Sequence, residues 1–425
     1  MKISNFISNP LFTGSAIVVV GTMSVNVLNY LYHLVIGRML GPSGYGELVA
    51  LISLASLLGI LPSSLNLVVI KYVSSSKEKK ELNNLIGWLR VRVFQFSLLF
   101  FALIILVSPL LSSFLHINNI FYLWLIALSF LFSLLATLNR AIMQGLLMFR
   151  QMIYSIFIEN IGKLFISIIL VYLSFYLFGT MLALVISAAI GCYLSFMYLK
   201  INNKGRLKRP SFIKKMILFA VPVMIQSFSA TSIYTSDLIL VKHFFSSYDA
   251  GIYAALSTLG KIIFFGTSPI SSVMFPLISQ KASRGESYKD ILRYSFITTL
   301  ILATVVLTIY WIFPDLAINL LYGKDFLGAS SMLLAFGVFI TLFTLSSLLI
   351  NYGLSIGKTR VVFFSFIAAL GQVIFISLFH KSLMMVITIS IIVNTLLLVS
   401  LLIYSSYGKP LTKGNKINFS HSPDL

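Results

Sequence analysis

The sequence predicts an all-α, multi-pass membrane protein with about twelve transmembrane helices, and three observations predict it. Of the 425 residues, 58% are hydrophobic and only 10% are charged, whereas soluble domains contain roughly 25% charged residues. The mean hydropathy is +0.99. Apolar runs of about 18 residues or more, long enough to cross a bilayer as a helix, recur along the whole chain. Together these observations exclude an ordinary soluble enzyme.

The apolar runs define the expected spans in order. The first run is too long for a cleavable signal peptide, and further spans follow it at once. Because the connecting segments are short, no soluble domain is expected between the spans. The cores of the runs are 13–36, 48–70, 93–111, 119–138, 154–174, 180–199, 216–236, 250–275, 294–313, 329–350, 361–379 and 383–404.

The positive charges fall mainly on alternate loops. The chain has 31 Lys and Arg against 11 Asp and Glu, a formal net charge of +20. If the N-terminus is cytoplasmic, 25 of these 31 basic residues lie on the cytoplasmic side, four lie outside, and only Lys163 and Lys261 lie within spans. This bias follows the positive-inside rule. We therefore expect a cell-membrane protein with both termini in the cytoplasm, and no nucleic-acid partner.

The two halves of the chain resemble each other at a period of about 206 residues. The segment GYGELVAL (44–51) corresponds to DAGIYAAL (249–256), with Gly46 matching Gly251. The match falls at the same span of each half, and an even number of spans per half makes the repeat parallel. Parallel repeats place the substrate between the halves, near the middle of the membrane.

The most basic segment, 200–215, divides the spans into six and six. It predicts an N-terminal lobe over residues 1–205 and a C-terminal lobe over residues 206–425, which ends in a short basic cytoplasmic tail. The positive charges of the segment are expected to anchor it at the cytoplasmic face, with acidic lipid headgroups as an alternative partner.

Three segments point to a family. The string RMLGPSGYG (38–46), which follows the first span, resembles the R-x-L-G-P-x-x-Y/F-G motif of polysaccharide-transport flippases. Ala220-Val221-Pro222 and LLYGKDF (320–326) are similar to other motifs of that family. These flippases are the Wzx-type members of the multidrug/oligosaccharidyl-lipid/polysaccharide exporter superfamily. The resemblance covers nearly the whole chain in order, although each motif is short.

The resemblance implies two six-helix lobes around a central cavity that opens alternately to either side. It also implies a substrate, which is a polyprenyl (pyro)phosphate-linked oligosaccharide. This lipid would be flipped from the cytoplasmic to the outer leaflet for surface polysaccharide biosynthesis. Membrane lipids and other polysaccharide-assembly proteins are the further partners it implies.

Charged residues inside spans are costly and mark functional sites or structural ion pairs. Glu159 and Lys163 are four residues apart on one helix, the favoured order for an ion pair. Asp237 and Lys261 form a second candidate pair on neighbouring spans. In the functional interpretation the two lysines bind the phosphate of the substrate, while Glu159 and Asp237 hold them or couple transport to protons or sodium. In the structural interpretation each pair only neutralises itself.

Other polar residues are weaker substrate-binding candidates. Arg140 is expected at the cytoplasmic edge of its span, and Arg38 at the outer side, where each could contact phosphate or serve anchoring and packing. Asn26 and Asn29 belong to a polar stripe on the first span that also includes Tyr30 and His33, and Gln226 occupies the comparable place in the second lobe. Such side chains bind sugar hydroxyls or link helices by hydrogen bonds.

No catalytic motif is found in the sequence. A Walker-type loop is absent, and the single cysteine, Cys192, excludes a cysteine-based metal cluster. We therefore expect no enzyme activity, no cofactor and no metal. Two alternatives remain: an ion-coupled multidrug or cation antiporter of the same superfamily, and a membrane polysaccharide polymerase or ligase. The second requires a large catalytic outer loop, and the outer loops here are short.

Overall fold

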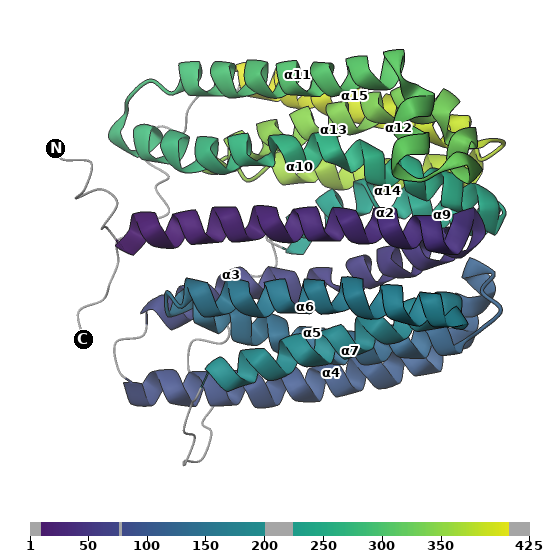
Figure 1. Ribbon diagram of the computed structural model, residues 1–425. Helices are drawn as coiled ribbons and strands as arrows, with labels where there is room; N and C mark the ends of the chain where they lie inside the picture. Colours follow the sequence, from purple (N-terminus) through teal and green to yellow (C-terminus); the bar gives the residue numbers. More distant parts are fainter. Residues whose placement is uncertain (1–9, 76–78, 200–223, 408–425) are drawn as a thin grey trace.

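The computed structural model describes residues 10–75, 79–199 and 224–407, and within these residues all regular structure is helical (Figure 1). Residues 224–233 form a helical segment that precedes α9. The labelled elements are α2 (Pro10–Leu58), α3 (Ile60–Ser75), α4 (Lys79–Leu115), α5 (Phe121–Gly145), α6 (Phe149–Leu170), η1 (Val171–Phe175), α7 (Tyr176–Tyr198), α9 (Ser236–Phe244), α10 (Ser247–Arg284), α11 (Lys289–Ile312), α12 (Pro314–Leu321), η2 (Lys324–Ala329), α13 (Ser330–Ser355), α14 (Val361–Leu378) and α15 (Leu383–Tyr407).

The helices confirm a multi-pass, all-α membrane protein. Among the described residues, nine helical stretches are long and apolar enough to cross a membrane. Two of them, Ile17–Leu58 and Phe149–Tyr198, each contain parts of two expected spans. The expected span 216–236 begins in residues outside the described ones, which explains why it is missing from the nine.

The merged helices contain sharp changes of direction. Gly41 lies within α2 at φ 69° and ψ 175°, a conformation that favours glycine. Pro42 follows and has no N–H to donate, so the helix ends and a new one starts there. Between α6 and α7, Ser174 and Tyr176 have positive φ values of 65° and 44°. Each break lets the chain turn back across the molecule.

Two helical lobes lie on either side of the first part of α2 (Figure 1). Helices α3 to α7 form the N-terminal lobe with α2, and helices α9 to α15 form the C-terminal lobe. Helix α2 packs against α6 on one side and α10 on the other. The expected boundary near residue 205 falls within 200–223, outside the described residues.

Helices α2 and α10 cross at Gly46 and Gly251, which occupy equivalent positions in the internal repeat. Gly46 packs against the backbone of Ser247 and Gly251, and Gly251 packs against the carbonyl of Pro42. A Cβ atom at either glycine would overlap backbone of the other lobe. The repeated glycines therefore allow α2 and α10 to approach closely.

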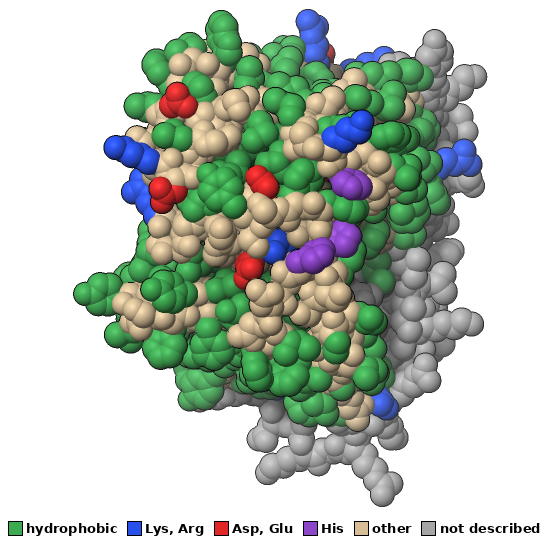
Figure 2. Space-filling view, turned by 90° about the vertical axis from the view of Figure 1, so that its right-hand side faces the viewer, with side chains coloured by type: hydrophobic (Ala, Val, Ile, Leu, Met, Phe, Trp, Pro, Cys, Tyr) green, Lys and Arg blue, Asp and Glu red, His purple; other side chains and the backbone are tan. Residues whose placement is uncertain are grey.

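The connections at the two ends of the molecule differ in their content of Lys and Arg, since Arg284, Lys289, Lys358 and Arg360 lie in connections at one end and only Lys381 in those at the other. One end, here named the basic end, contains the connections 145–149, 284–289 and 355–361. The opposite end, named the histidine end, contains the connections 115–121, 244–247 and 378–383. Figure 2 faces the histidine end, where histidine side chains gather near the middle of the surface. There His243 donates to the carbonyl of Phe114 at 2.6 Å, which links the two lobes.

Candidate functional site

A cavity of about 330 Å³ lies inside the N-terminal lobe between α2, α5, α6 and α7. We name it the hydroxyl-lined cavity. Helix α5 contributes Ser129, Ser133 and Thr137, which share one face because they are spaced by four residues. Ser56 of α2 and Ser187 of α7 add two further hydroxyls, and Glu159, Asn160 and Lys163 of α6 complete the polar part of the lining.

Lys163 links this cavity to α2. Its ammonium group donates to Oδ1 of Asn29 and lies 4.6 Å from the centre of the Tyr32 ring. Glu159 attracts it, yet the described residues show no salt bridge between Lys163 and a carboxylate. The half-buried lysine is therefore held by an amide oxygen and an aromatic ring, and its positive charge is not directly paired.

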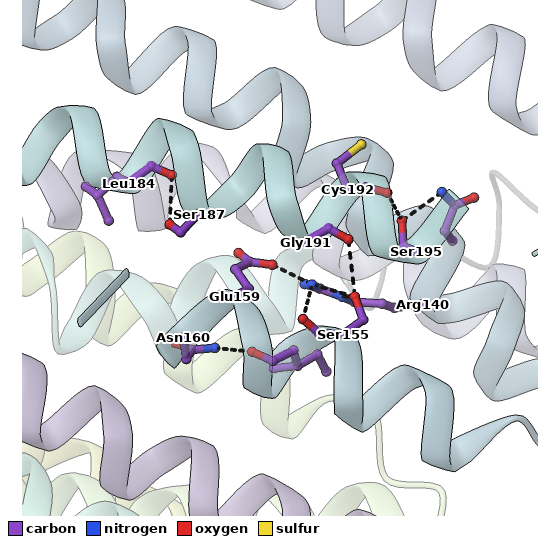
Figure 3. A network of polar contacts seen from close by, with 11 residues as sticks. Arg140, Ser155, Glu159, Asn160, Leu184, Ser187, Gly191, Cys192 and Ser195 are labelled. Atoms are coloured by element: carbon purple, nitrogen blue, oxygen red, sulfur yellow. Dashed lines mark hydrogen bonds and ion pairs between the residues drawn. The ribbon is translucent and has the colours of Figure 1, made fainter. Parts of the chain in front are cut away.

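Glu159 pairs with Arg140 instead of Lys163 (Figure 3). Arg140 also donates to Oγ of Ser155 at 3.0 Å and to the carbonyl of Ser155 at 3.2 Å. Gly191 of α7 makes room, because a Cβ atom there would overlap the Glu159 carboxylate. Helix α5 extends to Gly145, seven residues beyond the expected core, so Arg140 lies five residues before the end of the helix.

The C-terminal lobe has its own carboxylate and lysine. Asp237 is fully buried and accepts hydrogen bonds from the Tyr253 hydroxyl and the Leu238 N–H, each at 2.8 Å. The Lys261 ammonium lies 5.3 Å from the centre of the Tyr234 ring. Asp237 and Lys261 attract each other, but no salt bridge joins them within the described residues.

His33 of α2 lies close enough to interact electrostatically with both Lys163 and Lys261. Its Nδ1 is 3.2 Å from the Tyr45 hydroxyl, which in turn hydrogen-bonds Thr258 of α10 at 3.0 Å. One lysine from each lobe therefore lies within electrostatic range of His33, where α2 separates the lobes. Sequence reasoning placed His33 in a polar stripe but not among the site residues.

The remaining candidates lie at different places. Asn29 contacts Lys163 as described, and Asn26 is half-buried on the same helix. Gln226 accepts a hydrogen bond from Ser365 at 3.4 Å within the C-terminal lobe. Arg38 is exposed at the histidine end and donates to the carbonyls of Asn319 and Leu320. Arg38 thus ties α2 to α12 and does not reach the cavity.

Further contacts close the histidine end between the lobes. Lys242 lies 3.9 Å from the Glu47 carboxylate and donates to the Ser247 hydroxyl at 2.8 Å. Tyr45 hydrogen-bonds Tyr322 at 3.1 Å. With the His243 bond and the glycine crossing, these contacts hold the two lobes together at this end.

Sequence reasoning missed the hydroxyl side chains of the cavity. Ser129, Ser133 and Thr137 recur at positions i, i+4 and i+8 of an otherwise apolar run, and that spacing alone indicates a polar helix face. Among the described residues, no group of three or more His, Cys, Asp or Glu side chains is placed to hold a metal ion.

Comparison with known families gives one match that covers most of the chain. Residues 11–282 match the family described as "Polysaccharide biosynthesis protein". An uncharacterized membrane protein of Methanocaldococcus jannaschii is 25% identical over 266 residues, which are 59% of this chain. The matched region spans 63% of that relative's length.

Two solved structures share the fold. An inward-facing multidrug resistance MATE family transporter of the MOP superfamily has a TM-score of 0.75 and 13% identity, covering 88% of this chain and 94% of its own. The lipid II flippase MurJ, in an inward closed conformation, has a TM-score of 0.74 and 15% identity, covering 92% and 87% respectively. The expected architecture of two six-helix lobes is therefore confirmed.

Proposed function

Because the chain belongs to the polysaccharide biosynthesis protein family, we propose that it is a flippase for a polyprenyl (pyro)phosphate-linked oligosaccharide. The protein takes the lipid from the cytoplasmic leaflet and releases it in the outer leaflet by alternating access. The fold shared with a lipid II flippase supports this proposal. The product serves surface polysaccharide biosynthesis, and other proteins of that process are its partners.

The observation that carries the proposal is the unpaired positive charge of Lys163. A phosphate that leaves water loses its hydration, and cationic hydrogen-bond donors replace it. Lys163 and Lys261 supply such groups, one from each lobe, and His33 lies within electrostatic range of both. An anion between the lobes therefore interacts with both of them, which links binding to their relative movement.

The carboxylates argue against the antiporter alternative. A cationic drug requires an accessible negative charge, but Arg140 neutralises Glu159, and Tyr253 together with the Leu238 N–H covers Asp237. Both carboxylates remain the candidates for proton or sodium coupling. Transport in sealed vesicles that is insensitive to both gradients would contradict that coupling role.

The orientation completes the proposal. The positive-inside rule places the basic end in the cytoplasm, with both termini there, in the cell membrane. The contacts at the histidine end then close the outer face. This arrangement corresponds to the state that receives substrate from the cytoplasm.

The test is a flipping assay in proteoliposomes. The probe is a short-chain polyprenyl pyrophosphate disaccharide with a fluorescent group that dithionite reduces only in the outer leaflet. Wild-type protein should flip it, Lys163→Ala and Lys261→Ala should remove most of the activity, and the exposed Lys289→Ala should leave it intact. Unchanged flipping in both lysine variants would contradict the site. Export of rhodamine without flipping would favour the antiporter.

A further inference from the structure

Apart from Lys163, the lining of the hydroxyl-lined cavity is not used by the proposed phosphate site, and its chemistry suggests another ligand. We propose that it binds one sugar ring, the ring attached to the lipid phosphate. This inference rests on the proposed flippase function and assigns the part of the headgroup that enters the N-terminal lobe.

The cavity wall offers mainly hydrogen-bond acceptors. The hydroxyls of Ser56, Ser129 and Ser187 donate to the carbonyls of Ile52, Ile126 and Leu184 at 2.8, 2.8 and 3.1 Å. Each serine oxygen keeps its acceptor capacity. Figure 3 shows the Ser187 bond and the Asn160 amide, whose Nδ2 donates to the carbonyl of Ile156 at 2.8 Å, leaving Oδ1 as an acceptor.

Two further hydroxyls are uncommitted. Ser133 and Thr137 line the cavity, and within the described residues their hydroxyls make no hydrogen bond. Glu159 adds carboxylate oxygens, although its charge is balanced by Arg140. Away from Lys163, the lining therefore favours a ligand group that is rich in hydrogen-bond donors and carries no negative charge.

A sugar ring meets these requirements and a phosphate does not. Each sugar hydroxyl can donate to an acceptor and accept in return, whereas an ionised phosphate has only acceptor oxygens and cannot bond to the acceptors that dominate the wall. The volume of 330 Å³ is close to the small end of the ~300–1,000 Å³ range of small-molecule sites. It suits one ring rather than an oligosaccharide. Apolar lining from Ile126, Phe130 and Leu134 can contact the C–H groups of the ring.

Lys163 fixes the order of the headgroup. It lines the cavity, yet its ammonium group lies on the α2 side, next to Asn29 and Tyr32. A phosphate bound there lies at the rim, toward His33 and Lys261. The attached sugar then extends from the rim into the cavity, and the rest of the glycan stays outside it.

The experiment measures binding to the purified full-length protein by calorimetry. The probes are inorganic phosphate and the 1-phosphates of glucose, galactose and N-acetylglucosamine. At least one sugar 1-phosphate should bind about tenfold more tightly than inorganic phosphate, because a few net hydrogen bonds are gained. Ala188→Phe fills the cavity and should remove this difference, and the shape-conserving Thr137→Val should reduce it severalfold.

Thr180→Val is the matched control, since Thr180 is a buried hydroxyl of α7 that bonds the Leu177 carbonyl and does not line the cavity. Equal affinity for inorganic phosphate and every sugar 1-phosphate would overturn the sugar site. The sugar site would also be contradicted if the difference in affinity between sugar 1-phosphate and inorganic phosphate persisted in Ala188→Phe. The same holds if Thr180→Val removed that difference as fully as Thr137→Val does. If the affinity for inorganic phosphate is unchanged in Lys163→Ala, the result contradicts the proposed function instead.

Discussion

Each lobe has a lysine and a carboxylate in or next to its expected spans, Lys163 and Glu159 in the N-terminal lobe and Lys261 and Asp237 in the C-terminal lobe, but the residues around them differ. In the N-terminal lobe a second cation, Arg140, pairs with Glu159 and leaves Lys163 unpaired beside a cavity. In the C-terminal lobe neutral donors cover Asp237, and Lys261 lies against an aromatic ring.

The difference shows that equal charges do not give equal sites. Pairing a carboxylate with arginine places a second charge inside the lobe. The lysine then has no carboxylate partner and can interact with an anion. A carboxylate held by Tyr253 and a backbone N–H needs no second charge, and its lobe can pack tightly around it. For the proposed flippase, this difference favours headgroup binding mainly by the N-terminal lobe.

Arg140→Ala tests the charged arrangement and should have the largest effect. It leaves Glu159 without its partner at a site of low accessibility, and removing one member of a buried pair costs about 3–5 kcal/mol. The free energy of unfolding in detergent is the measurement. Adding Glu159→Gln should recover much of the loss, and a double variant as unstable as the single one would contradict the pairing.

Gly191→Ala tests the space that this arrangement requires. The added Cβ would overlap the Glu159 carboxylate and crowd Arg140, so we expect a loss of about 2 kcal/mol from overpacking. Gly162→Ala on α6 is the control, because its Cβ would meet only ordinary contacts at 3.9 Å or more. It should be neutral or stabilising in the same unfolding measurement. Equal effects of the two substitutions would contradict the packing argument.

Tyr253→Phe tests the neutral arrangement in the other lobe. Losing the hydroxyl leaves one Asp237 oxygen without its donor, at an expected cost of about 1.5 kcal/mol. Thermal unfolding, with the exposed Tyr248→Phe as control, measures it. A loss as large as that of Arg140→Ala would remove the distinction between the two lobes.

The smallest expected effect concerns the ring beneath Lys261. A double-mutant cycle with Tyr234→Leu and Lys261→Met isolates the cation–π contact, for which we expect a coupling of about 0.5–1 kcal/mol. The cycle is measured by unfolding in detergent. Strictly additive losses would show that Tyr234 supports the lobe only through packing.

The sequence predicts the fold better than the pairing of charges. Apolar runs locate the helices because every span must satisfy its backbone internally in lipid, and the loop charges predict which ends lie together. Spacing within one helix suggested that Glu159 pairs with Lys163, but in the structure Glu159 pairs with Arg140 of α5. That outcome depends on the packing of α5, α6 and α7, and on the space at Gly191, which no local pattern contains.

The candidate site shows the same limit. Lys163, Lys261 and Asn29 were recognisable because polar groups in apolar runs are rare. The electrostatic interaction of His33 with both lysines follows from how α2 packs against α6 and α10, which only the assembled fold determines. The hydroxyl face of α5, by contrast, was readable from its spacing of four residues.

The crossing of Gly46 and Gly251 has a mechanical consequence. Gly251 lies near the start of α10, and the helix extends about 50 Å beyond it at 1.5 Å per residue. With the crossing as fulcrum, a tilt of about 10° moves the far end of α10 by about 9 Å, while the histidine end hardly shifts. In such a tilt the two glycines act as the pivot, and the largest displacement occurs at the basic end.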